Sequence, residues 1–385
     1  MKECRSSCSL AYGFTRTTND TLAVMKHTDW RSPTAPPLVS FTSPEQLVRS
    51  LGEVPLSTDE LHAVRREVRL GLPPVVCAHV LGTLLGVSPQ LIRALAVRPR
   101  RYYREFSIAK KGGGVRPIAT PRVFLKVVQW WILDRILLPY SERILPESVC
   151  GFRPRRGTLH AAAPHVGARF LLRCDLADFF GSVSAAAVEG AFRRIRYGPL
   201  SAALLARLTT LGDALPQGAP TSPALANIAF ARCDSKLERL AEREGLHYSR
   251  YADDLFFSGA DPIKPGFAAR VSRTVSAEGF RLNSEKSRMM GPSQRRIVTG
   301  LVISEKAQPP RELRRRLRAR FHQAGLRPDL LGADSAALTG WASYVNMYDP
   351  DLGSEYLQVA RLVLSSKGAG TPDASRERRA RKKRA

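Results

Sequence analysis

The chain has 385 residues, and its 60 lysines and arginines against 34 aspartates and glutamates give a formal net charge of +26 at pH 7. A hydrophobic fraction of 44% is normal for a globular protein built as one large domain with subdomains. The charge favours a polyanionic partner, with binding that weakens as the salt concentration rises.

Cysteine spacing and apolar stretches exclude two further classes of protein. The cysteines form no CxxC pair, so neither a zinc site nor a disulfide framework is expected. The best apolar stretch, residues 75–87, is shorter than the roughly 18 residues needed to span a bilayer. Polar residues interrupt residues 1–10, where a signal peptide would have its apolar core. We therefore expect a cytoplasmic protein with no membrane partner.

The first hundred residues predict a leader followed by helices. Residues 1–40 are polar and punctuated by prolines, so they are expected to be poorly ordered. Residues 41–99 predict an α-helical N-terminal extension that begins at a Ser43 cap. A Pro-Pro pair at 73–74 divides it, and residues 75–97 are expected to form the second helical segment.

Two segments rich in glycine and basic residues follow. Residues 107–118, with the sequence SIAKKGGGVRPI, predict two short strands around a glycine turn. Residues 150–158 have the sequence CGFRPRRGT.

An apolar strand then ends on an acid. The apolar run before Asp175 breaks at that residue, which predicts a buried strand that delivers its carboxylate at the strand end. Asp178 lies three residues further on, and we expect it to be a charge at a helix N-terminus or a solvated acid.

A loop rich in proline and glycine separates this acid from the next acids. Its sequence, Leu-Pro-Gln-Gly at 215–218, precedes a long amphipathic helix with Ser222 as the expected N-cap and Gly245 at its end. A loop before a helix start can bring its backbone and the Gln217 amide against a nucleotide sugar or base. Without neighbouring acids, the same segment would be an ordinary junction between a loop and a helix.

Residues 251–254, Tyr-Ala-Asp-Asp, predict the tip of a β-hairpin, because apolar and aromatic residues flank them on both sides. Asp253 and Asp254 repel each other and raise each other's proton affinity unless a cation neutralises them, and Mg²⁺ is the expected cation. Taken alone, the four residues are more typical of an exposed acidic turn. With Asp175 nearby, they would complete a two-metal phosphoryl-transfer site.

The C-terminal part of the chain is strongly basic. Residues 295–301, RRIVTGL, are followed by a helix-like stretch at 311–320 that contains six arginines. Residues 366–385 are basic and lack apolar periodicity, so we expect a disordered tail that adds nonspecific affinity for RNA.

The order of acid-ended strand, LPQG loop and YADD hairpin resembles the reverse transcriptases, and most closely those of bacterial retrons, over roughly residues 100–350. Residues 107–118 are similar to the family's fingers hairpin, and residues 150–158 to its GFxPxRS/GT segment. Residues 278–286 resemble the palm motif after the hairpin, and residues 295–301 resemble the primer-gripping motif with its VTG signature.

One element departs from the retron pattern. Where these enzymes tend to carry Asn-Ala-x-x-His, this chain has Ala161 in place of the Asn and keeps His165. We interpret His165 as a packing residue.

The resemblance implies an α+β fold of the right-hand polymerase type, with an antiparallel palm sheet and an α-helical N-terminal extension. Fingers and palm would occupy residues 100–290, an RNA-binding thumb residues 291–365, and the tail residues 366–385.

The resemblance also assigns roles to particular residues. Asp175, Asp253 and Asp254 would be catalytic and would hold two Mg²⁺ ions, for which Mn²⁺ is a substitute, together with the backbone carbonyl of Leu176. A bulky ring at Phe180 would exclude a ribose 2′-hydroxyl. The residues implied to bind the nucleotide are Lys111, Arg116, Phe180, Gln217 and Lys286. Those implied to bind RNA are Val298, Thr299, Gly300, Arg314, Arg315 and Arg318.

The resulting hypothesis is an RNA-directed DNA polymerase that uses a cognate noncoding RNA as primer and template and dNTPs as substrates. Its product would be RNA-linked single-stranded DNA, an effector protein would be a further partner, and antiphage defence would be its role. Within the class, group II intron-like and diversity-generating reverse transcriptases share the palm motifs. An alternative from another class is a noncatalytic RNA-binding protein with the polymerase fold; the intact acids, with Gln217 and Arg116, argue against it.

Overall fold

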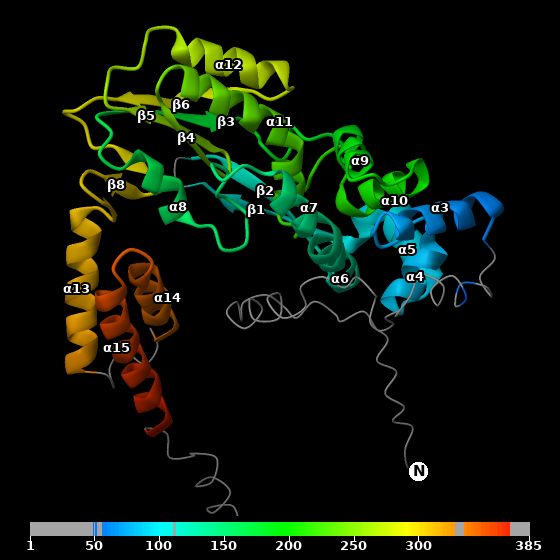
Figure 1. Ribbon diagram of the computed structural model, residues 1–385. Coiled ribbons are helices and arrows are strands. Elements are labelled where there is room, and N and C mark those ends of the chain that lie inside the picture. The colour runs from blue at the N-terminus through cyan, green and yellow to red at the C-terminus, as the bar shows by residue number, and fades with distance from the viewer. Residues whose placement is uncertain (1–48, 50, 52–55, 111–112, 328–334, 370–385) are drawn as a thin grey trace, which may run out of the picture.

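A computed structural model of the chain describes residues 49, 51, 56–110, 113–327 and 335–369. The expected leader over residues 1–40, the Ser43 cap, Lys111 and most of the basic tail lie outside these residues. In the described part, three regions follow one another along the chain: a helical N-terminal region, a central sheet with its helices, and a C-terminal helical bundle (Figure 1).

The N-terminal region contains three helices, and each start has a local cause. Ser57 and Glu60 form a capping box that begins α3, and Ser88 caps α5 by accepting a hydrogen bond from the Leu91 backbone. The single helical segment expected over residues 75–97 is wrong, because Gly86 takes a left-handed φ of +63° and ends α4. The bounds are α3 Thr58–Arg69, α4 Ala78–Leu85, α5 Pro89–Val97 and the 3₁₀-helix η1 Pro99–Tyr102.

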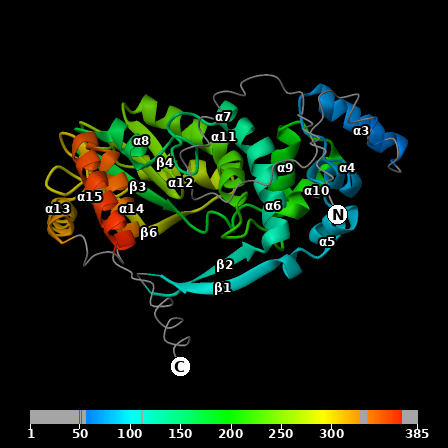
Figure 2. The same cartoon turned by 90° about the horizontal axis from the view of Figure 1, so that it is seen from below.

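A long two-stranded hairpin follows and extends away from the central sheet (Figure 2). Its strands pair antiparallel from Tyr103 opposite Pro121 to Ala109 opposite Val115, which confirms the two expected strands around a glycine turn. The bounds are β1 Tyr103–Ala109 and β2 Val115–Pro121, followed by α6 Val123–Ile132, the π-helical turn η2 Leu133–Leu137, α7 Leu138–Ile144, α8 Thr158–Ala162 and the 3₁₀-helix η3 Ala163–His165.

The central sheet has four antiparallel strands in the order β4-β5-β3-β6. Successive side chains along each strand point to opposite faces of the sheet. One face packs Leu172 and Phe257 into the large core under α11 and α12, which cover that side in Figure 1. The strand and helix bounds are β3 Phe170–Leu176, α9 Ala185–Arg194, α10 Pro199–Thr209, α11 Ser222–Arg243, β4 His247–Tyr251, β5 Asp254–Gly259, α12 Phe267–Ala277 and β6 Leu282–Met290.

The opposite face of the sheet packs Leu171 and Phe256 against Ala162 of α8 and against Val298, in a separate apolar cluster. Val298 belongs to a small three-stranded sheet, with bounds β7 Ile297–Val298, β8 Leu301–Ile303 and β9 Ala307–Gln308. Residues 297–308 therefore pack against the central sheet, although the sequence placed them in the thumb.

The C-terminal helices have a core of their own. Phe321 and Tyr356 stack with ring centroids 3.9 Å apart, inside a cluster that includes Leu317 and Val363. The bounds are α13 Arg311–Leu326, α14 Ser335–Asn346 and α15 Pro350–Ala369. The fold is thus α+β, with an antiparallel central sheet and a helical N-terminal region, as expected. None of the helices in the described residues has both the length and the apolarity needed to cross a bilayer.

Candidate active site

Strand register brings the three predicted acids to one end of the central sheet. Asp175 on β3 lies directly opposite Asp254 on β5. Asp253 occupies the turn between β4 and β5, and its carbonyl accepts a hydrogen bond from the Leu176 backbone at 2.8 Å. Asp254 begins β5 opposite Tyr251, so the turn itself is Ala252 and Asp253 and is one residue shorter than expected. The predicted hairpin with its paired acids is confirmed.

Two basic side chains already bond two of these carboxylates. Arg173, two residues before Asp175, donates from Nε and Nη2 to the two oxygens of Asp254 at 2.9 and 3.1 Å. Lys286 on β6 places its Nζ 3.1 Å from both oxygens of Asp175. Lys286 was a predicted site residue, whereas the role of Arg173 was missed. The sequence signal for Arg173 is its position two residues before Asp175, because side chains two residues apart lie on the same face of a strand.

Burial and mutual repulsion shift the pKa of two of the acids. Burial is the largest cause of the raised pKa of Asp253, and the charge of Asp175 adds to it; a backbone hydrogen bond and the charges of Lys286 and Arg116 oppose the shift. The pKa of Asp254 is also raised by burial, although the Arg173 guanidinium opposes the shift. The expected repulsion is therefore present, but loss of hydration is the larger cause.

The donor chemistry of the site fits Mg²⁺. Three carboxylates and the Leu176 carbonyl supply the hard oxygen ligands that this ion prefers. Within the described residues, however, no three acidic, histidine or cysteine side chains already converge as metal ligands. Asp254 and Asp175 instead bond Arg173 and Lys286, so ions would have to compete with these two cations for the carboxylates.

A cavity of about 500 Å³ lies between the fingers hairpin and the LPQG loop. Gln217 lines it, and the Gln217 carbonyl accepts a hydrogen bond from the Ala119 backbone at 2.8 Å, which attaches the loop to β2. Ser222 was expected to cap α11. The cap residue is Thr221, and the Ser222 hydroxyl instead donates to the Pro216 carbonyl at 2.8 Å. The loop is therefore braced from both sides, as a platform requires.

Asp178 also lines this cavity. It is exposed and lies in a left-handed turn with φ of +44°. The next helix, α9, begins at Ala185 with Ser184 as its cap, so the interpretation of Asp178 as a helix N-terminal charge is wrong. Its exposure fits the alternative expectation of a solvated acid.

Two aromatic rings lie together next to the acid strand. The ring of half-buried Phe180 is 5.9 Å from the ring of Phe152, measured between centroids, and Phe152 remains 41% exposed. Phe152 belongs to the GFRP segment, and its contact with Phe180 was not predicted from the sequence.

The other predicted residues occupy different surroundings. Arg116 is exposed on β2. Val298 is fully buried in the apolar cluster behind the sheet, so its side chain contacts the core and only its backbone could meet RNA. Thr299 and Gly300 form a turn with positive φ, and the Thr299 hydroxyl donates to the Thr158 carbonyl at 3.0 Å. Arg314 is half-buried on α13, where Arg315 and Arg318 are exposed.

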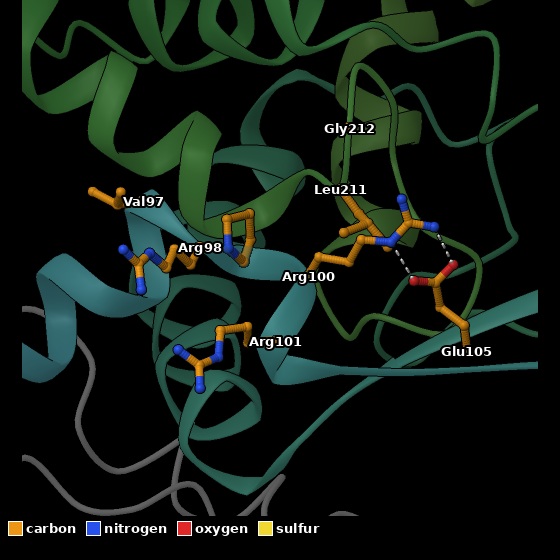
Figure 3. Close-up of a pocket in the computed structure, with 8 residues that line it drawn as sticks. Val97, Arg98, Arg100, Arg101, Glu105, Leu211 and Gly212 are labelled. Atoms are coloured by element: carbon orange, nitrogen blue, oxygen red, sulfur yellow. Dashed lines mark hydrogen bonds and ion pairs between the residues drawn. The ribbon is translucent and has the colours of Figure 1, made fainter.

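A second cavity of about 540 Å³ adjoins the first and shares Glu105 and Leu211 with it. Figure 3 shows Arg98, Arg100 and Arg101 around it. Arg100 pairs with Glu105 at 2.9 Å, whereas Arg98 and Arg101 form no ion pair with another described residue. These arginines belong to the run RPRRYYR at 98–104 of the sequence.

His165 links the two strands of the YADD hairpin. Its ring nitrogens lie 2.7 Å from the Ser258 hydroxyl and 2.8 Å from the Ser249 hydroxyl. The residue is fully buried, and burial lowers its pKa to about 3. His165 is therefore a neutral, hydrogen-bonded packing residue, as expected.

Comparisons with known proteins agree with this geometry. The family model described as reverse transcriptase (RNA-dependent DNA polymerase) matches residues 108–305. The retron Mx65 reverse transcriptase of Myxococcus xanthus is 38% identical over 328 residues, which cover 79% of this chain and 74% of that protein. The retron Ec86 reverse transcriptase of Escherichia coli is 36% identical over 287 residues, which cover 73% and 87%.

Among solved structures, the apo telomerase of Candida tropicalis, truncated from its C-terminal domain, is similar with a TM-score of 0.39 and 11% sequence identity. The similarity covers 54% of this chain and 55% of that one.

Proposed function

This chain belongs to the reverse transcriptases, and among them to the retron enzymes, which makes it an RNA-directed DNA polymerase; we propose that it copies a cognate structured noncoding RNA into RNA-linked single-stranded DNA. That RNA would serve as both primer and template, and dNTPs would be the substrates. The observation that carries the proposal is the register that pairs Asp175 with Asp254 at one end of the central sheet, next to Asp253 in the turn.

The reaction would be attack of a primer hydroxyl on the α-phosphate of a dNTP, with the barrier lowered mainly by positioning and charge neutralisation. Asp175, Asp253, Asp254 and the Leu176 carbonyl would hold two Mg²⁺ ions, or Mn²⁺ in their place, and such ions activate the attacking hydroxyl and stabilise the leaving pyrophosphate. The carboxylates supply the negative charge for this arrangement, and their raised proton affinity is relieved when cations are near.

The nucleotide would lie in the cavity between the hairpin and the loop. Gln217 would contact its sugar or base, and the Phe180 ring would lie below the sugar, where a ribose 2′-hydroxyl would clash with it. Arg116 and Lys286 provide positive charge, since both lower the pKa of Asp253 by their Coulombic effect. Lys111, which lies between β1 and β2 in the sequence, is the further proposed phosphate contact.

Two basic surfaces would contact the nucleic acid. The Arg98 and Arg101 cavity adjoins the nucleotide cavity and would receive the template strand. Arg314, Arg315 and Arg318 of α13, with the backbone of the Val298–Gly300 turn, would contact the RNA or the RNA–DNA product. Arginines that form no ion pair with a described residue suit phosphate oxygens.

Antiphage defence with an effector protein as partner, and a cytoplasmic location, complete the proposal. The defence role and the effector rest on the resemblance to retrons, and the location rests on the cysteine spacing and the short apolar stretches of the sequence.

Nucleic acid that copurifies with the protein expressed from its native locus tests the proposal. Wild type is compared with the Asp253→Asn/Asp254→Asn variant, and the extract is treated with RNase and with a 2′,5′-debranching enzyme. A discrete RNA-linked single-stranded DNA that the variant lacks is the expected result. Bound RNA without DNA in either sample would contradict the proposal and favour an RNA-binding role.

A further inference from the structure

A wholly buried ion pair lies behind the YADD turn. Arg250 on β4 and Asp234 on α11 are both 0% exposed, and the guanidinium donates from Nε and Nη2 to the two carboxylate oxygens at 2.7 Å each. Removing two charges from water is costly, and well-packed apolar residues often replace such a pair without loss of stability. The pair therefore calls for an explanation other than stability.

The third guanidinium nitrogen points to the catalytic turn. Nη1 of Arg250 donates to the Ala252 carbonyl at 3.0 Å and to Oδ1 of Asn227 at 2.9 Å. Ala252 is the residue before Asp253 and holds a left-handed φ of +58°, which an alanine rarely adopts without support. The buried guanidinium thus holds the carbonyl at the strained position.

The same network holds the turn from its other side. Nδ2 of Asn227 donates to the Gly151 carbonyl at 2.9 Å. Gly151 packs directly against the turn, since a Cβ added there would lie 2.2 Å from the Ala252 nitrogen. The GFRP segment is also attached to β4, because the Cys150 backbone donates to the Arg250 carbonyl at 2.9 Å.

Aromatic rings enclose the guanidinium. Its central carbon lies 5.0 Å from the ring centroid of Phe230 and 5.6 Å from that of Phe179. Phe179 immediately precedes Phe180 on the segment after Asp175. One side chain, Arg250, therefore contacts the acid-strand segment, the helix after the LPQG loop and the YADD turn, and it reaches the GFRP segment through Asn227.

We propose that Arg250 is a positioning residue of the polymerase: through the Ala252 carbonyl and Asn227 it fixes the turn, and so sets where Asp253 stands relative to Asp175. The proposal rests on the proposed function, in which Asp253 serves catalysis. A merely structural ion pair would stabilise the fold without controlling the turn.

The network offers a matched pair of variants, because some of its hydrogen bonds reach the turn and another lies on the side away from it. Asn227→Ala removes the bonds to Nη1 and to Gly151 and leaves the ion pair intact. Tyr248→Phe removes the 2.8 Å bond that the Tyr248 hydroxyl donates to Oδ1 of Asp234, on the side away from the turn. Each variant loses buried hydrogen bonding, so a purely structural role predicts similar effects on activity from both.

The experiment measures three quantities on the full chain: the melting temperature, kcat and KM for dNTP over a range of Mg²⁺ concentrations, and Mn²⁺ affinity by electron paramagnetic resonance without nucleotide. Asn227→Ala is expected to lower kcat and Mn²⁺ affinity by about 10–100-fold, the usual effect of removing a group that orients metal ligands, with KM for dNTP little changed. Tyr248→Phe is expected to keep the kcat and the Mn²⁺ affinity of the wild type.

Equal kcat and equal Mn²⁺ affinity in the two variants would overturn the proposal. If Asn227→Ala does not fold, Arg250→Lys replaces it: a lysine keeps the charge next to Asp234 but cannot bond both carboxylate oxygens and the Ala252 carbonyl together. Wild-type kcat and Mn²⁺ affinity in Arg250→Lys would likewise overturn it. A wild type without polymerase activity would instead refute the proposed function.

Discussion

Gly151 lies so close to Ala252 that a Cβ on Gly151 would stand 2.2 Å from the Ala252 backbone nitrogen. The contact, and not a positive φ, requires glycine at this position. Gly151→Ala must therefore shift the turn that carries Asp253. A displacement of about 1 Å at a reacting group costs on the order of 100-fold in rate, and the crowding costs about 1–3 kcal/mol of stability.

Primer extension at saturating dNTP measures the effect on rate. Gly157→Ala is the matched control in the same segment, because a Cβ there has nothing within 4 Å. A Gly151→Ala enzyme as fast as the Gly157→Ala enzyme would mean that the turn tolerates displacement.

Sugar discrimination is predicted to depend on the Phe180 ring. Phe180→Val removes the bulk below the sugar, so the preference for dATP over ATP is expected to fall by about 10–200-fold, the range for steric discrimination in a pocket. The ratio of the two kcat/KM values measures the change. Phe180→Tyr keeps a six-membered ring and should keep the preference. A valine variant with the wild-type ratio would assign Phe180 to packing against Phe152.

Asp253 is predicted to destabilise the metal-free protein at neutral pH. Its folded-state pKa lies above the ordinary 3.8, because of burial and of the charge on Asp175. A carboxyl with a raised folded pKa contributes stability at low pH, and that stability is lost as the pH rises through the folded value. In EDTA at pH 7.5, Asp253→Asn should therefore melt higher than wild type, and the difference should disappear in acid.

Thermal melts with and without Mg²⁺ check this prediction. Mg²⁺ should stabilise the wild type more than Asp253→Asn, since a bound ion stabilises the folded state that holds it. Glu189→Gln, on α9, controls for loss of one negative charge elsewhere. Melting temperatures of Asp253→Asn below the wild type in EDTA would contradict the prediction.

The strands and the hairpin of the site could be predicted because their signals are local. Asp175 at the end of an apolar run and the YADD turn between two apolar strands each fix a strand end within a few residues. The contacts of Arg250 could not be predicted. In the sequence it resembles an ordinary polar position near a turn, and its buried partners come from residues 227 and 234. The local pattern places Arg173 on the same face as Asp175, but its pairing with Asp254 depends on strand order, which that pattern leaves open.

His165 is predicted to make stability depend on pH. The Ser249 hydroxyl donates to the Ala161 carbonyl at 2.8 Å, so its oxygen accepts a hydrogen bond from Nε2–H of His165, and Nδ1 of His165 accepts one from the Ser258 hydroxyl. The folded pKa of about 3 lies below the ordinary 6.5. The unfolded chain therefore takes up the proton first, and stability falls as the pH drops from 6.5 toward 3, by about 1.4 kcal/mol for each pH unit.

Urea unfolding at pH 7.5 and at pH 5.5 measures this dependence. His165→Gln should be less stable at pH 7.5, because an amide fits the two hydroxyls less well, but it should lack this part of the acid-induced loss. His62→Gln, an exposed position, is the control. An equal loss of stability in wild type and His165→Gln would mean that His165 is not held neutral.

The template strand is predicted to cross the Arg98 and Arg101 cavity. This cavity shares Glu105 and Leu211 with the nucleotide cavity, so the unpaired template upstream of the templating base would reach it within a few nucleotides. Primer–templates with a one-nucleotide overhang and with a ten-nucleotide overhang separate the two cavities. Arg98→Gln/Arg101→Gln should raise KM for the long overhang only, and should lower the salt dependence of its binding, because two phosphate contacts are lost.

Arg193→Gln/Arg194→Gln, on α9, removes the same charge elsewhere. If both double variants bind both overhangs more weakly, the effect comes from net charge alone. If only Arg98→Gln/Arg101→Gln has an effect, and only on the long overhang, the template lies in that cavity.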